Sequence, residues 1–276
     1  MKTKYSILYC LMCTYIVIMP LIQEGTNFKG LPASDFLIGI VLFVYIIKLI
    51  SDKDTRKRFF YGVKDMFTRP LSIFILILLG MMLLSTIYAL EKKLALSESA
   101  RFITYVFIFF VVRYEFNTQK LVKNLLKCYI STATILSIFG IIQYFTKIGL
   151  DKKFVEQYGS GYRVVKIAAT MYNPNAYSAF LILIIFPVLM LAIYEKNKKF
   201  KSIYALISIL ILINILMTYS RNIYVAVCIG ALILCVIYSY KLIIVFGMVG
   251  ISTLFMPSVF DRARDLTNAS QNASRF

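Results

Sequence analysis

Nine long apolar runs constrain this chain more than any other feature of its sequence. A helix needs about 20 mostly apolar residues to cross a bilayer core about 30 Å thick. We therefore predict an all-α fold, a polytopic transmembrane helical bundle of about nine spans that forms a single membrane domain over residues 1–276. The predicted spans are residues 5–22, 33–50, 70–90, 99–113, 122–146, 174–194, 202–219, 223–240 and 242–257.

Basic residues outnumber acidic ones, and their distribution predicts the orientation of the spans. The chain holds 31 Lys and Arg residues against 13 Asp and Glu residues, which gives a formal net charge of +18. If the N-terminus is cytoplasmic, 18 of the 31 basic residues fall inside, including the dense loops at 52–69 and 195–201. Cytoplasmic loops are enriched in Lys and Arg. Topology and anionic membrane lipid explain these loops, so no nucleic acid is expected as a partner.

The composition excludes several classes of function. The chain has no His, which excludes within it a Ser-His-Asp or Cys-His nucleophile and any His-ligated zinc. Its 60% of apolar residues exceeds the roughly 45–50% of soluble domains and is too high for a disordered or DNA-binding basic protein. Its sequence shows no cluster of metal ligands on the predicted outer face, so we expect no metal and no cofactor.

The first candidate site is the short segment 218–222, Thr-Tyr-Ser-Arg-Asn. It joins the spans at 202–219 and 223–240 so briefly that the two helices must form a tight hairpin. Arg221 lies there on the predicted outer face, where positive charge is disfavoured. An Arg side chain matches a phosphate with two parallel hydrogen bonds, but it also serves as an ordinary interfacial anchor. Both interpretations stay open from the residues alone.

The second candidate site is the Asn-Pro-Asn run that opens the span at 174–194 on the same predicted face. Asn173 is well placed to cap that helix, and Pro174 suits the first turn, where its missing N–H costs nothing. Capping alone can therefore explain the run. The free N–H groups of a helix start also bind anions, so Asn173 and Asn175 near a lone Arg are candidates for a phosphate site.

Two other predicted outside segments carry basic residues. Residues 148–172 contain Arg163 and a Gly-Ser-Gly run, which fits either a mobile substrate-facing loop or a solvated connection. The polar segment 258–276 carries Arg275. Its other two Arg residues are interpreted as salt-bridged loop charges.

Together, the two motifs resemble the O-antigen ligase and O-antigen polymerase superfamily. Members carry a Gly-Asn-Pro-Asn-like segment at a span start and, one span later, a Ser-Arg motif followed by small and apolar residues. Here residues 173–176 match the first motif, with larger residues before them. Residues 220–221 match the second, with Asn where Gly is common. The likeness in span order covers most of the chain.

The resemblance implies a reaction at the outer face of the cytoplasmic (inner) membrane. Such proteins transfer a glycan from a polyprenyl-diphosphate carrier to an acceptor glycan or lipid in surface polysaccharide biosynthesis, without a nucleotide sugar or a metal. Arg221 would stabilise the charge that develops on the leaving diphosphate, and Arg275 resembles a second family Arg by position. Ligases supply a His that this chain lacks, and we favour a polymerase. We assign substrate binding to Asn173, Asn175, Tyr219, Ser220 and Arg163.

The resemblance also carries an expectation about the length of the chain. Family members have about a dozen spans, with a large outside loop after roughly the ninth. We therefore expect this chain to be an N-terminal fragment, whose residues 258–276 begin that extracytoplasmic loop.

The alternative function is a transporter or flippase for a lipid-linked or small anionic substrate, although span interiors almost free of charge disfavour it. A structural membrane protein would leave Arg221 and the Asn-Pro-Asn run without a role.

Overall fold

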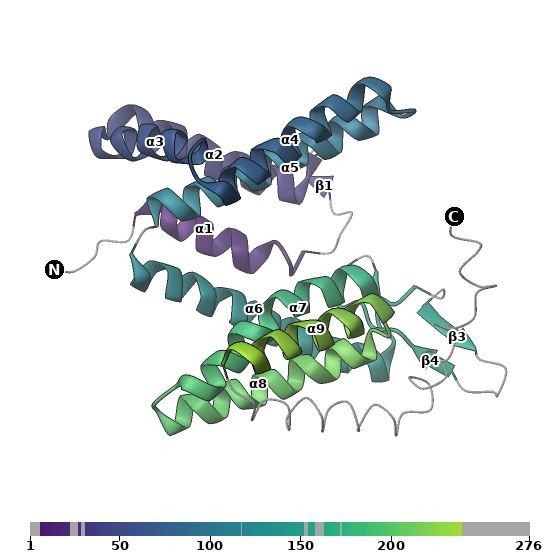
Figure 1. Ribbon diagram of the computed structural model, residues 1–276. Coiled ribbons are helices and arrows are strands. Elements are labelled where there is room, and N and C mark those ends of the chain that lie inside the picture. The colour runs from purple at the N-terminus through teal and green to yellow at the C-terminus, as the bar shows by residue number, and fades with distance from the viewer. Residues whose placement is uncertain are drawn as a thin grey trace. The chain divides into compact units, whose positions relative to one another are not determined.

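The described part of the chain is mostly helical in the computed structural model (Figure 1), which confirms the all-α prediction. The structure describes residues 6–22, 27–28, 31–116, 118–151, 154–157, 163–171 and 173–238. It divides into two compact units. Unit 1 comprises Met1–Met19 and Asn27–Cys128, and unit 2 comprises Pro20–Thr26 and Tyr129–Phe276. One helix, α6, contributes its first residues to unit 1 and the rest to unit 2.

Five helices among the described residues are long and apolar enough to cross a membrane. They coincide with the third to seventh predicted spans, and α5 is longer than the predicted span at 99–113. Their length and composition identify the chain as a multi-pass helical membrane protein. The five are α4 (Pro70–Tyr88), α5 (Lys92–Glu115), α6 (Gln119–Thr146), α7 (Pro174–Tyr194) and α8 (Lys198–Met217).

Three more helices overlap predicted spans. Helix α2 (Ala33–Ser51) matches the second predicted span, whereas α1 (Ile7–Ile18) and α9 (Arg221–Ile237) are apolar but shorter than a full crossing requires. The ninth predicted span, at 242–257, lies outside the described residues. The total of about nine spans, the cytoplasmic N-terminus and the single membrane domain stay predictions.

Helix α3 (Lys53–Met66) occupies a segment that the sequence predicted only as a basic loop. The Asp52 side chain starts it, because one carboxylate oxygen accepts from the Asp54 N–H at 3.1 Å and the other from the Thr55 N–H at 3.3 Å. This is the standard way to satisfy free N–H groups at a helix start. Its buried residues are Thr55, Gly62 and Met66, a helical spacing that gives α3 one inward face.

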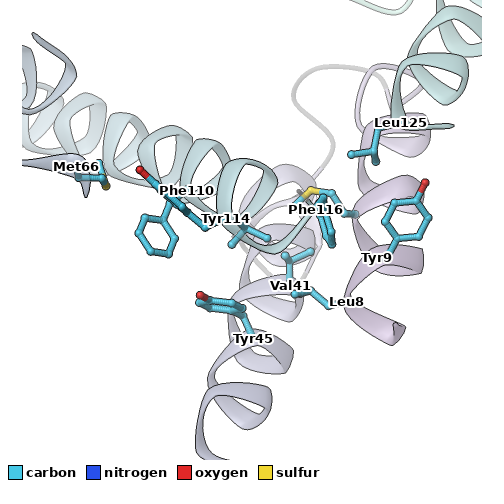
Figure 2. Packing of buried hydrophobic residues seen from close by; sticks show 11 residues of the cluster. Leu8, Tyr9, Val41, Tyr45, Met66, Phe110, Tyr114, Phe116 and Leu125 are labelled. Atoms are coloured by element: carbon cyan, nitrogen blue, oxygen red, sulfur yellow. The ribbon is translucent and has the colours of Figure 1, made fainter. Parts of the chain in front are cut away.

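The core of unit 1 joins α1, α2, α3, α5 and the start of α6 (Figure 2). Leu8, Met12 and Val111 are fully buried in it. The Tyr9 hydroxyl donates to the Leu121 carbonyl at 3.2 Å, which fastens α1 to the first turn of α6. A Cβ added at Gly62 would lie 2.8 Å from a Phe110 ring atom. Glycine is therefore what lets α3 pack so closely on α5.

A buried carboxylate with two cations lies beside this core. The Glu115 side chain is only 1% exposed, and its Oε2 lies 3.1 Å from both the Lys48 Nζ and an Arg58 Nη. The Arg58 Nε also donates to Oε1 at 3.3 Å. The three residues come from α5, α2 and α3, so this ion cluster locks three helices together.

A second carboxylate, Asp65, fixes the end of α3 and gives a pH-dependent prediction. It accepts from the Arg69 Nε at 2.9 Å and from the Tyr114 hydroxyl at 2.8 Å. The Arg69 hydrogen bond, and next the Tyr114 one, hold the pKa of Asp65 below its ordinary value of 3.8. The charged form is thus favoured by folding above about pH 4, and this stabilisation is lost as the pH falls through the folded-state pKa.

We expect Asp65→Asn to lower the free energy of unfolding of the detergent-solubilised chain at neutral pH. The difference from wild type should stay constant down to about pH 5 and shrink toward about pH 2, because wild-type Asp65 becomes protonated there. Denaturant titrations at several pH values measure this difference. A difference that grows as the pH falls would contradict the assignment.

Two short hairpins accompany the helices within the described residues. In unit 1, β1 (Asn27–Phe28) and β2 (Leu31–Pro32) form an antiparallel pair that leads into α2. In unit 2, β3 (Val155–Gln157) and β4 (Arg163–Val165) pair antiparallel ahead of α7.

Among the described helices of unit 2, α7 packs most extensively against α8, and α9 packs mainly on α7. Between β4 and α7, the Thr170 hydroxyl donates to the Pro20 carbonyl at 2.6 Å. The turn that follows α1 is therefore held by the segment just before α7.

Candidate functional site

The candidate site lies at the end of unit 2 where α7 and α9 begin and α8 ends. The strand β4 leads there from the hairpin drawn beside these helices (Figure 1). The Ile167 N–H donates to the Met217 carbonyl at 3.2 Å. This bond ties the chain just before α7 to the last residue of α8, so the two sequence motifs begin from connected segments.

The start of α7 has the predicted cap. The Asn173 side chain accepts a hydrogen bond from the Ala176 N–H at 2.8 Å, and Pro174 is the first helical residue. Asn175 is exposed in the first turn. The cap is confirmed, while binding of a substrate by Asn173 and Asn175 stays a prediction.

The turn between α8 and α9 is as tight as the sequence predicted, because α8 ends at Met217 and α9 begins at Arg221. Tyr219 is buried and has a positive φ of 52°, a conformation unusual for a residue with a large side chain. Ser220 precedes the first helical residue in an extended conformation. The Tyr224 hydroxyl donates to the Leu216 carbonyl at 2.6 Å and closes the hairpin.

A buried glutamine on α6, which sequence reasoning missed, shapes the approach to α7. Gln143 is 1% exposed. Its Oε1 accepts from the N–H groups of Ala168 and Ala169 at 3.0 and 2.9 Å, and its Nε2 donates to the carbonyls of Ile148 and Ala169 at 3.2 Å. Ala169 has a φ of 50°. The amide thus holds a left-handed backbone turn shortly before the Asn173 cap.

A second buried amide lies close to the candidate site. Asn214 on α8 is fully buried; its Oδ1 accepts from the Tyr177 hydroxyl at 3.0 Å, and its Nδ2 donates to the Ser137 carbonyl at 3.0 Å. A Cβ at Gly140 would collide with the Asn214 Oδ1. This cluster joins α6, α7 and α8 directly under the ends that carry the two motifs.

Three predicted site residues remain to be placed, and all three are arginines. Arg163 is the first residue of β4, where it pairs with Gln157 across the hairpin. Arg221 is the first residue of α9. Arg275 lies outside the described residues, and the roles of all three stay predictions. Among the residues that the structure describes, no group of three His, Cys, Asp or Glu side chains is gathered as a metal site.

Comparison with known proteins adds no relative. No protein family, no curated protein and no solved structure matches the chain. The class, a multi-pass helical membrane protein, follows from the long apolar helices alone. Its function is inferred from the candidate site.

The two amides that organise the site had a signal in the sequence. Gln143 and Asn214 are polar residues within predicted spans, and polar residues in lipid are retained where they face the protein interior. An analysis restricted to the charged residues of the spans does not identify Gln143 and Asn214. The contacts of Gln143, with residues 25 and 26 positions along the chain, are not visible from sequence spacing.

Proposed function

We propose that the chain belongs to a membrane glycan polymerase or ligase that transfers an oligosaccharide from a polyprenyl-diphosphate carrier to an acceptor glycan or lipid. One observation carries the proposal. The Ile167–Met217 hydrogen bond couples the segment that leads to the Asn-Pro-Asn helix start with the turn that leads to Ser220 and Arg221. Both motifs of the resemblance thus belong to one connected end of unit 2.

The chemistry asks for positive potential near a diphosphate. When the acceptor hydroxyl attacks the anomeric carbon, the C–O bond to the diphosphate breaks and its electron pair goes to the leaving diphosphate, while the hydroxyl proton is released to water. The starts of α7 and α9 present the positive ends of their helix dipoles, and no side-chain cap from Ser220 occupies the first N–H groups of α9. The Arg221 guanidinium would add a permanent positive charge, and its N–H donors match the spacing of phosphate oxygens. Such preorganised groups stabilise the developing charge.

The backbone next to the two motifs is held in defined conformations, which supports a rigid binding site. Ala169, four residues before Asn173, and Tyr219, directly before Ser220, both adopt left-handed backbone. Residues held in rare conformations cluster at functional sites. Gln143 and Asn214 hold the segments around them with buried hydrogen bonds. These backbone contacts support a preorganised site at the starts of α7 and α9.

The test is Arg221→Lys in the chromosomal gene of the producing organism. We expect a reduction of roughly tenfold to a hundredfold in transfer, because Lys keeps the charge but loses the fork. Surface polysaccharide should become short or sparse on gels, and carrier-linked units should accumulate in lipid extracts.

The matched control is Arg101→Lys, the same substitution at a half-exposed Arg that pairs with Glu98 on α5. It should leave polysaccharide unchanged at equal protein abundance. Unchanged length and amount with Arg221→Lys would refute the proposal. Loss of a small-anion transport activity without any effect on polysaccharide would favour a transporter instead.

A further inference from the structure

The face of α3 opposite its buried side carries an interleaved set of cations and aromatic rings. We call this set the cationic-aromatic stripe. Phe60 and Tyr61 are 69% and 62% exposed within it. Lys53, Lys57 and Lys64 flank Phe60 at separations of three, four or seven residues, a spacing that aligns side chains along one helix face. The stripe comprises the exposed residues Lys53, Arg56, Lys57, Phe60, Tyr61 and Lys64.

The rotation of α3 about its axis is fixed by contacts on its other side. Gly62 lies against Phe110 and Tyr114, with no room for a side chain. Two charged residues of the inner side are already engaged, since Arg58 pairs with Glu115 and Asp65 with Tyr114. Turning the stripe inward would break these bonds, so the stripe faces away from α5.

If α4 and α5 cross the membrane, as their length and hydropathy indicate, α3 lies at a membrane surface. Only three residues separate its end at Met66 from the start of α4, a span-length apolar helix. It contacts α5 at the last turns of that helix, where Phe110 and Glu115 lie. On the flanking helices, Ile50 and Phe74 are 71% and 70% exposed, as residues that face lipid are.

We infer that the cationic-aromatic stripe of α3 binds the headgroups of anionic phospholipid. Lysines near a membrane surface are attracted to anionic headgroups, and the rings of Phe and Tyr partition into the interface. In water the two exposed rings would leave apolar area unburied, whereas the interface satisfies rings and ammonium groups together. The inference concerns the lipid around unit 1 and does not depend on the proposed transferase reaction.

The absence of Trp from the chain permits a direct test with a single fluorescent reporter. The full chain carrying Phe60→Trp is reconstituted into vesicles of equal parts phosphatidylcholine and phosphatidylglycerol. Brominated acyl chains, which quench indole fluorescence, are carried by one lipid in the first set and by the other lipid in the second. We expect quenching by brominated phosphatidylglycerol to exceed quenching by brominated phosphatidylcholine about twofold or more, and added salt to reduce the excess.

Two matched changes decide the cause of any excess. Adding Lys53→Gln, Lys57→Gln and Lys64→Gln to the reporter chain should bring the ratio of the two quenching values to one. Adding Lys92→Gln and Lys93→Gln, two exposed lysines at the start of α5, should leave the ratio unchanged.

A second reporter tests whether the preference is local to α3. With Leu183→Trp, at an exposed residue in the middle of α7 and away from any lysine along the chain, the two lipids should quench equally. Equal quenching with Phe60→Trp, no quenching by either lipid, or a ratio that survives the triple lysine substitution would each overturn the inference. Gel filtration of every variant verifies that the chain remains folded.

Discussion

Glu115→Gln is expected to lower the free energy of unfolding by about 3 kcal/mol, because removing one partner of a buried ion pair leaves the other charges uncompensated. The Glu115 side chain is 1% exposed and holds both Lys48 and Arg58. Those two cations are 26% and 35% exposed, so water recovers part of the loss and the cost lies at the lower end of the usual range. Denaturant unfolding in mixed micelles measures it.

Glu98→Gln is the matched control for this prediction. It removes the same charge from an ion pair on α5 in which Glu98 and Arg101 are both 47% exposed. Exposed pairs contribute at most about 1 kcal/mol. Equal effects of the two substitutions would show that the Glu115 cluster does not hold α2, α3 and α5 together.

Gly140→Val is expected to cost about 3 kcal/mol, since overpacking and the loss of buried hydrogen bonds add. The new Cβ would collide with the Asn214 Oδ1 and lie 3.0 Å from the Tyr177 hydroxyl. Asn214 cannot move aside without breaking its bonds to Tyr177 and Ser137. The same titration in mixed micelles measures the change.

Two further variants isolate the cause of the Gly140 effect. Gly80→Val on α4, where an added Cβ meets no atom within 4 Å, should be nearly neutral. Combining Gly140→Val with Asn214→Ala should cost less than the sum of the two single changes, because the smaller residue frees the space. Full additivity would mean that Gly140 and Asn214 do not interact.

Local features of the site could be predicted because their physics is local. Asn173 and Pro174 occupy the cap and first turn of α7, and both preferences act within a few residues. The hairpin between α8 and α9 follows from the brevity of the segment at 218–222. Similarly, the apolar runs predict the five long helices, since length and hydropathy alone decide whether a helix can cross lipid.

Long-range contacts explain what the sequence could not predict. The place of Gln143 depends on two backbone N–H groups that arrive from another part of the chain, and that of Gly140 on a side chain of α8. Helix α3 had a local signal. Its buried positions Thr55, Gly62 and Met66 recur at helical spacing, but the dense charge between them favoured the interpretation as a loop.

The bond between Thr170 and Pro20 has a consequence for biosynthesis. Its two residues are 150 positions apart, and ribosomes add on the order of 5–20 residues per second. The turn after α1 must therefore wait roughly 8 to 30 seconds for its partner to emerge. Unit 1 ends at Cys128, so all of its residues have been synthesised before this bond within unit 2 can form.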